Sequence, residues 1–349
     1  MFGFGSSKSV VGLDIGSSSI KAVELKKIKG EIQVAHLGVE RLGSDIVVDS
    51  MIVDSGSVSS AISKLFSDRK FSSRLVATAV SGHSVIVKKI SMQTVPENEV
   101  PDLLQTEAAQ YIPFDMNDVN IDYQVLTEDP NEPQMDVLLA AVKKDKILNY
   151  TNVLSLAGKI PEVVDIDAFA LQNCYEYNYE PSPTSTVALL NLGASVMNIN
   201  IVKGSTPLFT RDVSVGGNQY TDSLQKEIDL SFDDAEALKM GESLGKVSPD
   251  AKLPILKQVT EIIVLEIQKT FDFFRATAAG QHIEKIYLAG GSSAVPGLTE
   301  ALRQEFSMPV EILNPFQRIQ PNGAGDLIGQ NAGQLAVAVG LALRSFESL

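Results

Sequence analysis

The strongest constraint on the fold of this chain is an internal repeat that begins near residue 10 and again near residue 186. Each copy has an apolar run ending in Asp-Ile-Gly or Asn-Leu-Gly, then a second alternating run and, after a Lys-Gly turn, a third. These patterns predict strands over residues 10–15, 18–27 and 32–41, and again over 186–192, 195–202 and 206–213. Two copies of one three-stranded meander predict two similar domains that face each other.

The segments around the repeat predict a mixed α/β chain. Residues 84–157 have the pattern of a compact β-α-β-β-α unit inserted into the first domain. We therefore expect a first domain of residues 1–83 and 158–183, an insert of residues 84–157, and a second domain of residues 184–349. In the second domain, a long helix over 254–277 is expected to bury its apolar stripe, and a closing helix over 332–346 to pack back on the first domain.

Composition narrows the function classes. The chain has 349 residues, enough for two compact units, and its 44% hydrophobic and 21% charged residues are ordinary for a globular protein. Its 43 acidic residues outnumber its 29 basic ones, and the formal net charge of −14 disfavours nucleic acid as a main partner. Cys174 has no second cysteine to pair with, as expected in a reducing compartment. No apolar run is long enough to span a membrane, and Asp14 interrupts the N-terminal apolar run too early for an export signal, so we expect a cytoplasmic protein.

The first glycine turn has the composition of an anion-binding nest. Small residues after a strand leave backbone N–H groups unobstructed, and the donors expected here are Gly16, Ser17, Ser18 and Ser19. Lys21 is placed either to reach a phosphate oxygen or to be solvated, and Asp14 to face Mg²⁺ through water. An ordinary hairpin is the alternative for this segment taken alone.

The second copy carries an equivalent turn, in which Asn191 precedes a nest formed by Gly193, Ala194 and Ser195. Two opposed nests can hold a di- or triphosphate from both sides. A third segment, residues 287–297, predicts a strand, a glycine turn and a helix start. The residues that let a base or a ribose approach the backbone there are Gly290, Gly291 and Ser292. Alone, that turn is equally well an ordinary strand–helix loop.

The order of these three elements resembles that of the actin, Hsp70 and sugar-kinase superfamily. The resemblance implies a duplicated, actin-like (ribonuclease H-like) α/β fold with ATP and Mg²⁺ bound between the two domains. The turns at Gly16 and Gly193 resemble the two phosphate motifs of the superfamily, and Gly290-Gly291 resembles its adenosine motif. By the same resemblance, further nucleotide contacts are expected from Gly216, Gly217, Glu236 (at the ribose) and Lys239 (by the base).

One position departs from the superfamily pattern. Hydrolytic relatives usually carry Asp where this chain has Asn191, and a neutral amide cannot replace a carboxylate that holds Mg²⁺ or orients a water. Asp167, at the start of a predicted helix, is a candidate to polarise a water, with a helix N-cap as its alternative role. We therefore expect ATP binding with slow or absent hydrolysis, used to fix one conformation.

Within the superfamily, the insert resembles that of the division protein FtsA and of the type IV pilus assembly family PilM. Residues 11–21, 105–115 and 163–170 resemble the PilM family in particular. This resemblance implies a component of the inner-membrane pilus platform that binds the cytoplasmic N-terminal segment of PilN between the first domain and the insert, and that contacts the assembly motor ATPase. Membrane attachment is then indirect, whereas FtsA continues into a membrane-binding helix beyond the point, Leu349, where this sequence ends.

Two other functions stay open at this stage. A small-molecule kinase of the same superfamily needs a carboxylate base, for which Asp167 is the candidate. An FtsA-like division protein forms filaments, and self-association of this chain is likewise left open.

Overall fold

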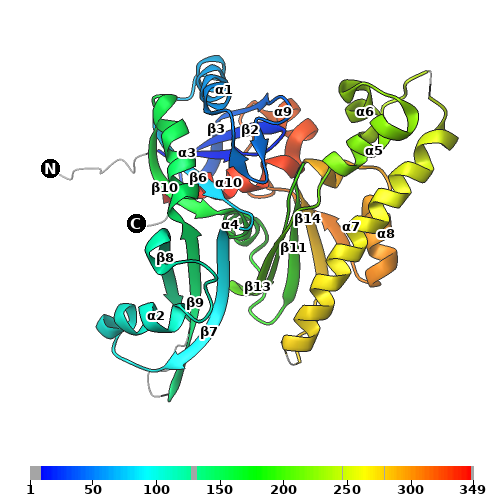
Figure 1. The fold of residues 1–349 in the computed structure, drawn as a ribbon. Helices are drawn as coiled ribbons and strands as arrows, with labels where there is room; N and C mark the ends of the chain where they lie inside the picture. Colours follow the sequence, from blue (N-terminus) through cyan, green and yellow to red (C-terminus); the bar gives the residue numbers. More distant parts are fainter. Residues whose placement is uncertain (1–8, 127–131, 246, 279, 347–349) are drawn as a thin grey trace.

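The computed structural model describes residues 9–126, 132–245, 247–278 and 280–346, so Leu349 lies outside the described ranges. Two five-stranded sheets form the frame of the molecule (Figure 1). The first has the order β10-β6-β1-β2-β3, with strands β1 (Val11–Ile15), β2 (Ser19–Ile28), β3 (Glu31–Arg41), β6 (Leu75–Val80) and β10 (Ile160–Ile166). The second has the order β13-β12-β11-β14-β15, with strands β11 (Thr186–Leu192), β12 (Met197–Lys203), β13 (Thr206–Val213), β14 (Lys285–Ala289) and β15 (Val310–Ile312).

The two sheets have the same topology. In each, three consecutive strands pair antiparallel. A later strand then pairs in parallel with the first of the three, and one more strand pairs in parallel with that added strand: β6 and then β10 in the first sheet, β14 and then β15 in the second. Glycines at the hairpin ends allow the tight turns, because Gly30 and Gly204 both adopt positive φ. The repeat in the sequence is therefore a repeat in the fold, and the duplicated actin-like prediction is confirmed.

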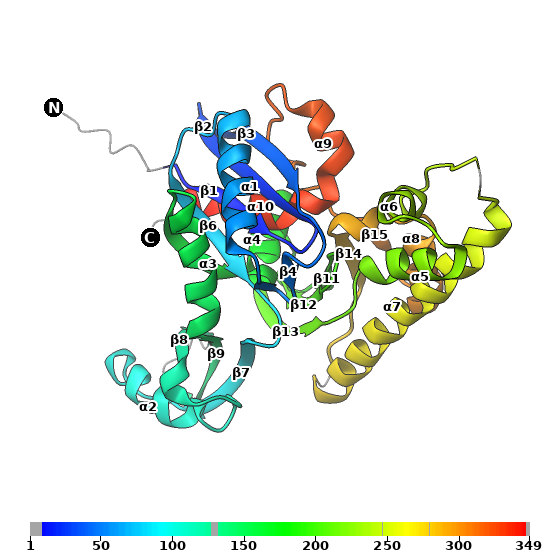
Figure 2. The same cartoon turned by 45° about the horizontal axis from the view of Figure 1, so that its top comes forward.

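The insert forms a small sheet of its own. Its strands, in the order β7-β9-β8, are β7 (Val85–Gln93), β9 (Gln134–Lys143) and β8 (Val119–Val125). Helix α2 (Val100–Ala108) covers this sheet through Leu104, which shares a core with Ile90 and Val137. The insert extends from the lower end of the first half in both ribbon views (Figures 1 and 2).

Helix α3 (Lys144–Leu156), which was expected to be the last helix of the insert (84–157), is not part of the core that α2 shares with the insert sheet. Its residues Tyr150, Val153 and Leu154 share a core with strand β1 and with helix α1 (Ser55–Asp68).

Two helices fill the space between the sheets. Helices α4 (Asp167–Tyr179) and α10 (Ala336–Leu343) contact each other, and both contribute to a core shared by the two sheets. A Cβ at Gly340 would collide with the carbonyl group of Ala170, and a Cβ at Gly12 with that of Ala338. The absence of a side chain at these two glycines allows the backbones of the packed segments to approach closely.

The closing helix is shorter than the expected 332–346. Only residues 336–343 of this range are α-helical, and 3₁₀ turns stand on either side of α10.

The other α-helices described in the second half are α5 (Asn218–Ile228), α6 (Phe232–Lys239), α7 (Pro249–Thr277), α8 (Leu298–Phe306) and α9 (Gly325–Asn331). Helix α7 begins at Pro249, a residue type that is common at the first position of a helix. The expectation that its whole apolar stripe is buried is wrong. Ile255, Val259 and Ile263 are buried, but Ile262 and Phe273 are 42% and 55% exposed. Among the described residues, no helix has both the length and the apolar character that crossing a bilayer requires.

Candidate functional site

The two glycine turns meet across a cleft between the halves of the molecule. In the first turn the Gly16 N–H donates to the Ser19 carbonyl at 3.1 Å, and in the second the Gly193 N–H donates to the Val196 carbonyl at 3.0 Å. The Ser195 hydroxyl donates to the Ser17 hydroxyl at 2.8 Å. The turns therefore share one geometry and face each other.

Most of the expected site residues line this cleft. Those brought together are Asp14, Gly16, Ser17, Ser18, Lys21, Asp167, Asn191, Gly193, Ala194, Ser195, Gly290 and Gly291. The cleft holds a volume of only about 60 Å³, whereas small-molecule sites usually enclose roughly 300–1,000 Å³. In the described conformation the space between the two turns is therefore narrow for a ligand of nucleotide size.

The first turn carries a local ion pair. Asp14 and Lys21 stand directly opposite each other on β1 and β2, and the Lys21 Nζ lies 3.2 Å from the Asp14 Oδ2. Both side chains are mostly buried, with 16% and 11% of their surface exposed. Of the two alternatives for Lys21, solvation is thus excluded in this conformation, since its ammonium compensates the Asp14 carboxylate at the wall of the cleft.

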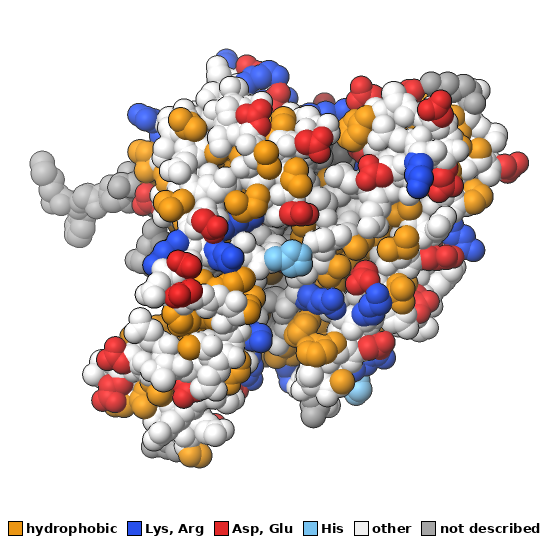
Figure 3. Space-filling view, in the orientation of Figure 1, with side chains coloured by type: hydrophobic (Ala, Val, Ile, Leu, Met, Phe, Trp, Pro, Cys, Tyr) orange, Lys and Arg blue, Asp and Glu red, His pale blue; other side chains and the backbone are white. Residues whose placement is uncertain are grey.

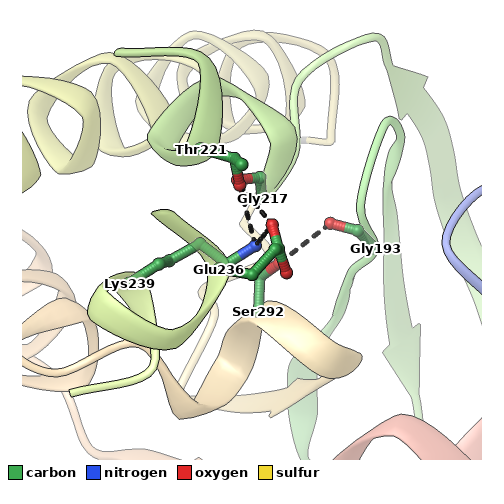
Figure 4. A network of polar contacts seen from close by, with 6 residues as sticks. All are labelled: Gly193, Gly217, Thr221, Glu236, Lys239 and Ser292. Atoms are coloured by element: carbon green, nitrogen blue, oxygen red, sulfur yellow. Dashed lines mark hydrogen bonds and ion pairs between the residues drawn. The ribbon is translucent and has the colours of Figure 1, made fainter. Parts of the chain in front are cut away.

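The second turn is held by the loops that follow it. The Gly193 carbonyl accepts hydrogen bonds from the Gly217 N–H at 2.9 Å and from the Ser292 hydroxyl at 3.0 Å (Figure 4). A Cβ at Gly216 would collide with the Ala194 carbonyl. The second turn is therefore held in place by contacts with Gly216, Gly217 and Ser292. These three residues do not line the cleft.

Glu236 and Lys239 form a polar network with Thr221 next to Gly217 and Ser292, in which Lys239 and Thr221 are buried and Glu236 is partly exposed (Figure 4). The Lys239 Nζ lies 2.5 Å from the Glu236 Oε1 and donates to the Thr221 hydroxyl at 3.1 Å. Lys239 is 4% exposed. In this conformation Glu236 and Lys239 form an ion pair with each other and do not line the cleft. Ser19 is buried in β2 and does not line the cleft either.

Asp167 lies at the floor of the cleft in an acidic environment. Burial, with a further contribution from Asp14, raises the pKa of Asp167 to about 7, while a hydrogen bond with Ser81 opposes the shift. Its alternative role as an N-cap is excluded, because α4 begins at Asp167 itself and Ile166 occupies the N-cap position.

Several residues at the cleft were missed from the sequence. Strands β4 (Val47–Val48) and β5 (Met51–Ile52) form a short hairpin whose turn residues, Asp49 and Ser50, both adopt positive φ. The Ser50 carbonyl accepts hydrogen bonds from the Lys146 ammonium and, at 3.0 Å, from the Tyr150 hydroxyl. A polar pair between two short apolar runs is a hairpin signal that was available in the sequence.

Lys146 is the buried cation of this region. It is 1% exposed, and burial lowers its pKa to about 8, while Asp167 and Asp212 oppose the shift. Within the described ranges, no group of three or more His, Cys, Asp or Glu side chains is arranged to hold a metal ion. A divalent cation would thus depend on few carboxylates and on water.

A family model of the type IV pilus assembly protein PilM matches residues 12–346. The chain belongs to the PilM family. A solved structure of a PilM–PilN type IV pilus biogenesis complex contains a chain that is 26% identical to this PilM-family protein, with a TM-score of 0.86 over 98% of this chain and 100% of that chain.

More distant likeness extends to the ethanolamine utilization protein EutJ. The protein of Escherichia coli (strain K12) is 27% identical over 118 residues, and that of Salmonella typhimurium 26% identical over 161 residues. These matches cover 34% and 44% of this chain, and they span only 38% and 48% of the length of the two EutJ proteins. The EutJ structure from Carboxydothermus hydrogenoformans shares the fold, at 15% identity and a TM-score of 0.58, over 96% of this chain and 89% of that chain.

Proposed function

We propose that this PilM-family protein binds the cytoplasmic N-terminal segment of PilN and so belongs to the inner-membrane platform of the type IV pilus machine. The observation that carries the proposal is the likeness, over 98% of the chain, to a protein solved as a PilM–PilN complex. Membrane association is then indirect, through PilN. Contact with the assembly motor ATPase, and self-association, are extensions of the same proposal.

We place the PilN segment where the insert meets the first half. Hydrophobic side chains gather on the upper part of the insert, close to charged ones (Figure 3). The Lys143 ammonium lies 4.4 Å from the centre of the half-buried Phe114 ring, and Leu148 of α3 is 57% exposed. Apolar surface beside lysines suits a short peptide that carries both apolar and acidic residues.

We further propose that the cleft binds ATP with Mg²⁺. The residues fit: no hydrogen bond among the described residues uses the backbone N–H groups of Ser17, Ser18, Ala194 or Ser195, and such groups are suited to phosphate. Lys21 adds a positive charge, and Asp14 is the residue that would hold Mg²⁺ through water. Glu236 and Lys239 are assigned to the ribose and the base.

The bound cation would neutralise phosphate charge in this site. Asn191 offers no carboxylate to orient a water, so hydrolysis should be slow or absent, and Asp167 is the remaining candidate to polarise a water. The function proposed for the nucleotide is to hold the two halves in one relative position. Because the Ser17–Ser195 hydrogen bond closes the cleft, binding has to break it.

The test is a fluorescence-anisotropy titration of a labelled PilN N-terminal peptide with the full chain, with and without Mg-ATP. Saturable binding that a scrambled peptide does not reproduce is expected, with an affinity that changes when Mg-ATP is added. Absence of peptide binding in both conditions contradicts the proposal. ATP-dependent sedimentation together with direct liposome binding would instead favour the FtsA-like alternative, and phosphoryl transfer to a small molecule would favour the kinase.

A further inference from the structure

Three polar side chains form a row across the second sheet, one on each of three adjacent strands. Asn191 of β11 stands directly opposite Asn198 of β12, which stands directly opposite Asp212 of β13. Directly opposed residues of antiparallel strands place their side chains on the same face of the sheet. We call these three residues the Asn–Asn–Asp ladder.

Hydrogen bonds join the ladder from end to end. The Asn191 Nδ2 donates to the Asn198 Oδ1 at 2.8 Å, and the Asn198 Nδ2 donates to the Asp212 Oδ1 at 2.8 Å. The other Asp212 oxygen accepts the Gly82 N–H at 2.5 Å. Asn198, in the middle, is 2% exposed. The ladder thus connects the cleft to Gly82, just before the insert strand β7.

The direction of these bonds is fixed by chemistry. Burial raises the pKa of Asp212, and the hydrogen bonds from Asn198 and Gly82 oppose that shift because they stabilise the ionised carboxylate. A backbone N–H only donates and an ionised carboxylate only accepts, so ionised Asp212 requires Asn198 to present its NH₂ group. The Asn198 side-chain oxygen then faces Asn191, and Asn191 has to donate to it with its own NH₂ group. The remaining Asn191 oxygen is left at the cleft end, against Gly290, where a Cβ would lie 2.8 Å from it.

We propose that Asp212 and Asn198 are positioning residues that hold the Asn191 amide with its oxygen toward the cleft, so that the second turn offers a neutral hydrogen-bond acceptor. The inference rests on the nucleotide site proposed above. A neutral oxygen accepts hydrogen bonds from the waters of a hydrated divalent cation without repelling a triphosphate as a carboxylate does. Carboxylate charge is present on this wall, but it lies two strands away on β13.

The ladder predicts a specific pattern of coupling between its ends. In Asn191→Asp a carboxylate faces the Asn198 side-chain oxygen, so two acceptors oppose each other. Asn198 cannot turn to relieve this, because its NH₂ group is needed as the donor to Asp212. Asp212→Asn allows every bond to reverse, since the new amide can accept from Gly82 and donate to Asn198. In the double variant the carboxylate has moved to position 191, and every donor again meets an acceptor.

The first experiment measures the melting temperature of the full chain, without nucleotide, for both single variants and the double variant. We expect Asn191→Asp to lower it by roughly 3–6 °C, and Asp212→Asn to restore at least half of that loss when the two are combined. The matched control is Asn120→Asp, on the exposed insert strand β8, which Asp212→Asn should not rescue. Additive losses in the double variant would overturn the ladder. If Asn191→Asp alone fails to fold, a folded double variant supports the ladder and an unfolded one overturns it.

The second experiment compares ATP binding in Mg²⁺ with ATP binding in EDTA by calorimetry. Asp212→Asn turns the Asn191 NH₂ group toward the cleft, so the preference of the wild-type protein for the magnesium complex should shrink by roughly 3- to 10-fold. An unchanged preference overturns the orientation assigned to Asn191. If the wild-type protein binds ATP in neither condition, the proposed nucleotide site fails, and the melting temperatures still decide whether the ladder exists.

Discussion

The two glycine turns have the same backbone geometry and different supports. Each follows the first strand of its sheet and is closed by one hydrogen bond from the glycine N–H to the carbonyl three residues later. Behind the first turn, Asp14 faces Lys21 as an ion pair; behind the second, Asn191 faces Asn198 as a pair of neutral amides. On the third strand of each sheet, the residue directly opposite the second member of the pair is Val39 in the first sheet and Asp212 in the second.

This difference shows how a duplicated fold becomes an asymmetric site. Strand topology places both turns at one cleft, and it does so in the same way in both halves. Side chains decide what each wall offers, which is a charged pair on one side and a neutral acceptor on the other. The fold therefore sets the position of the site, and residues one or two strands away set its chemistry.

The largest expected difference between the turns is steric. A Cβ at Gly216, next to the second turn, would collide with backbone atoms of Ala194 and Gly193, whereas a Cβ at Gly16 would meet the Lys21 ammonium at 2.9 Å and the Ser19 carbonyl at 3.2 Å. Gly216→Ala should therefore lower the free energy of unfolding by about 3 kcal/mol. Gly16→Ala should cost less than about 1 kcal/mol. Urea unfolding of both variants tests this, and equal losses would show that the two turns are packed alike.

The next difference concerns the cation. Asp14→Ala removes the carboxylate assigned to Mg²⁺, and the affinity for Mg-ATP should fall by about 10- to 100-fold. Asn191→Ala removes a neutral group and should cost only about threefold. Calorimetric titration of both variants measures this contrast. A larger loss for Asn191→Ala, or an unchanged affinity for Asp14→Ala, would contradict the assignment of the metal to the first turn.

Asp167, which lies at the floor between the turns, gives a pH-dependent prediction. Its pKa is raised to about 7 in the folded state, mainly by burial, from an ordinary value of 3.8. Between these values the folded state keeps a proton that the unfolded state has lost, so this residue lowers stability as the pH rises from about 4 to about 7.

Asp167→Asn should remove that contribution. The gain in unfolding free energy relative to the wild type should grow with pH across this range, by on the order of 1–2 kcal/mol. Chemical denaturation at several pH values, in EDTA and without nucleotide, is the measurement. A gain that is independent of pH would show that the Asp167 carboxyl titrates normally in the folded protein.

The smallest effect is expected at the contact between the turns. Ser195→Ala removes the hydrogen bond to Ser17 and should lower stability by about 1 kcal/mol or less. Because a nucleotide has to break this bond, the affinity for Mg-ATP should rise by up to about fivefold. Thermal unfolding and calorimetry check both values, with Ser18→Ala as the control. A clear loss of affinity would instead assign the Ser195 hydroxyl to the ligand.

The repeat made the fold predictable, since hydrophobic alternation and the two Lys-Gly turns locate both meanders. The cleft lining was predictable where it consists of the turns themselves. Contacts that join distant segments were not predictable, because no local pattern connects Asp212 with Gly82, or Lys146 with Ser50. Strand β15, of only three residues, was also missed, as its pattern is too short to distinguish a strand from a loop.

The most direct measurement is hydrogen–deuterium exchange of the full chain with and without Mg-ATP. If one polyphosphate is held between the two glycine turns, amides of residues 16–19 and of residues 193–196 should both gain protection, and to a comparable degree. Protection of only one turn, or of neither while ATP is bound elsewhere, would contradict the claim that the duplicated turns form a single nucleotide site.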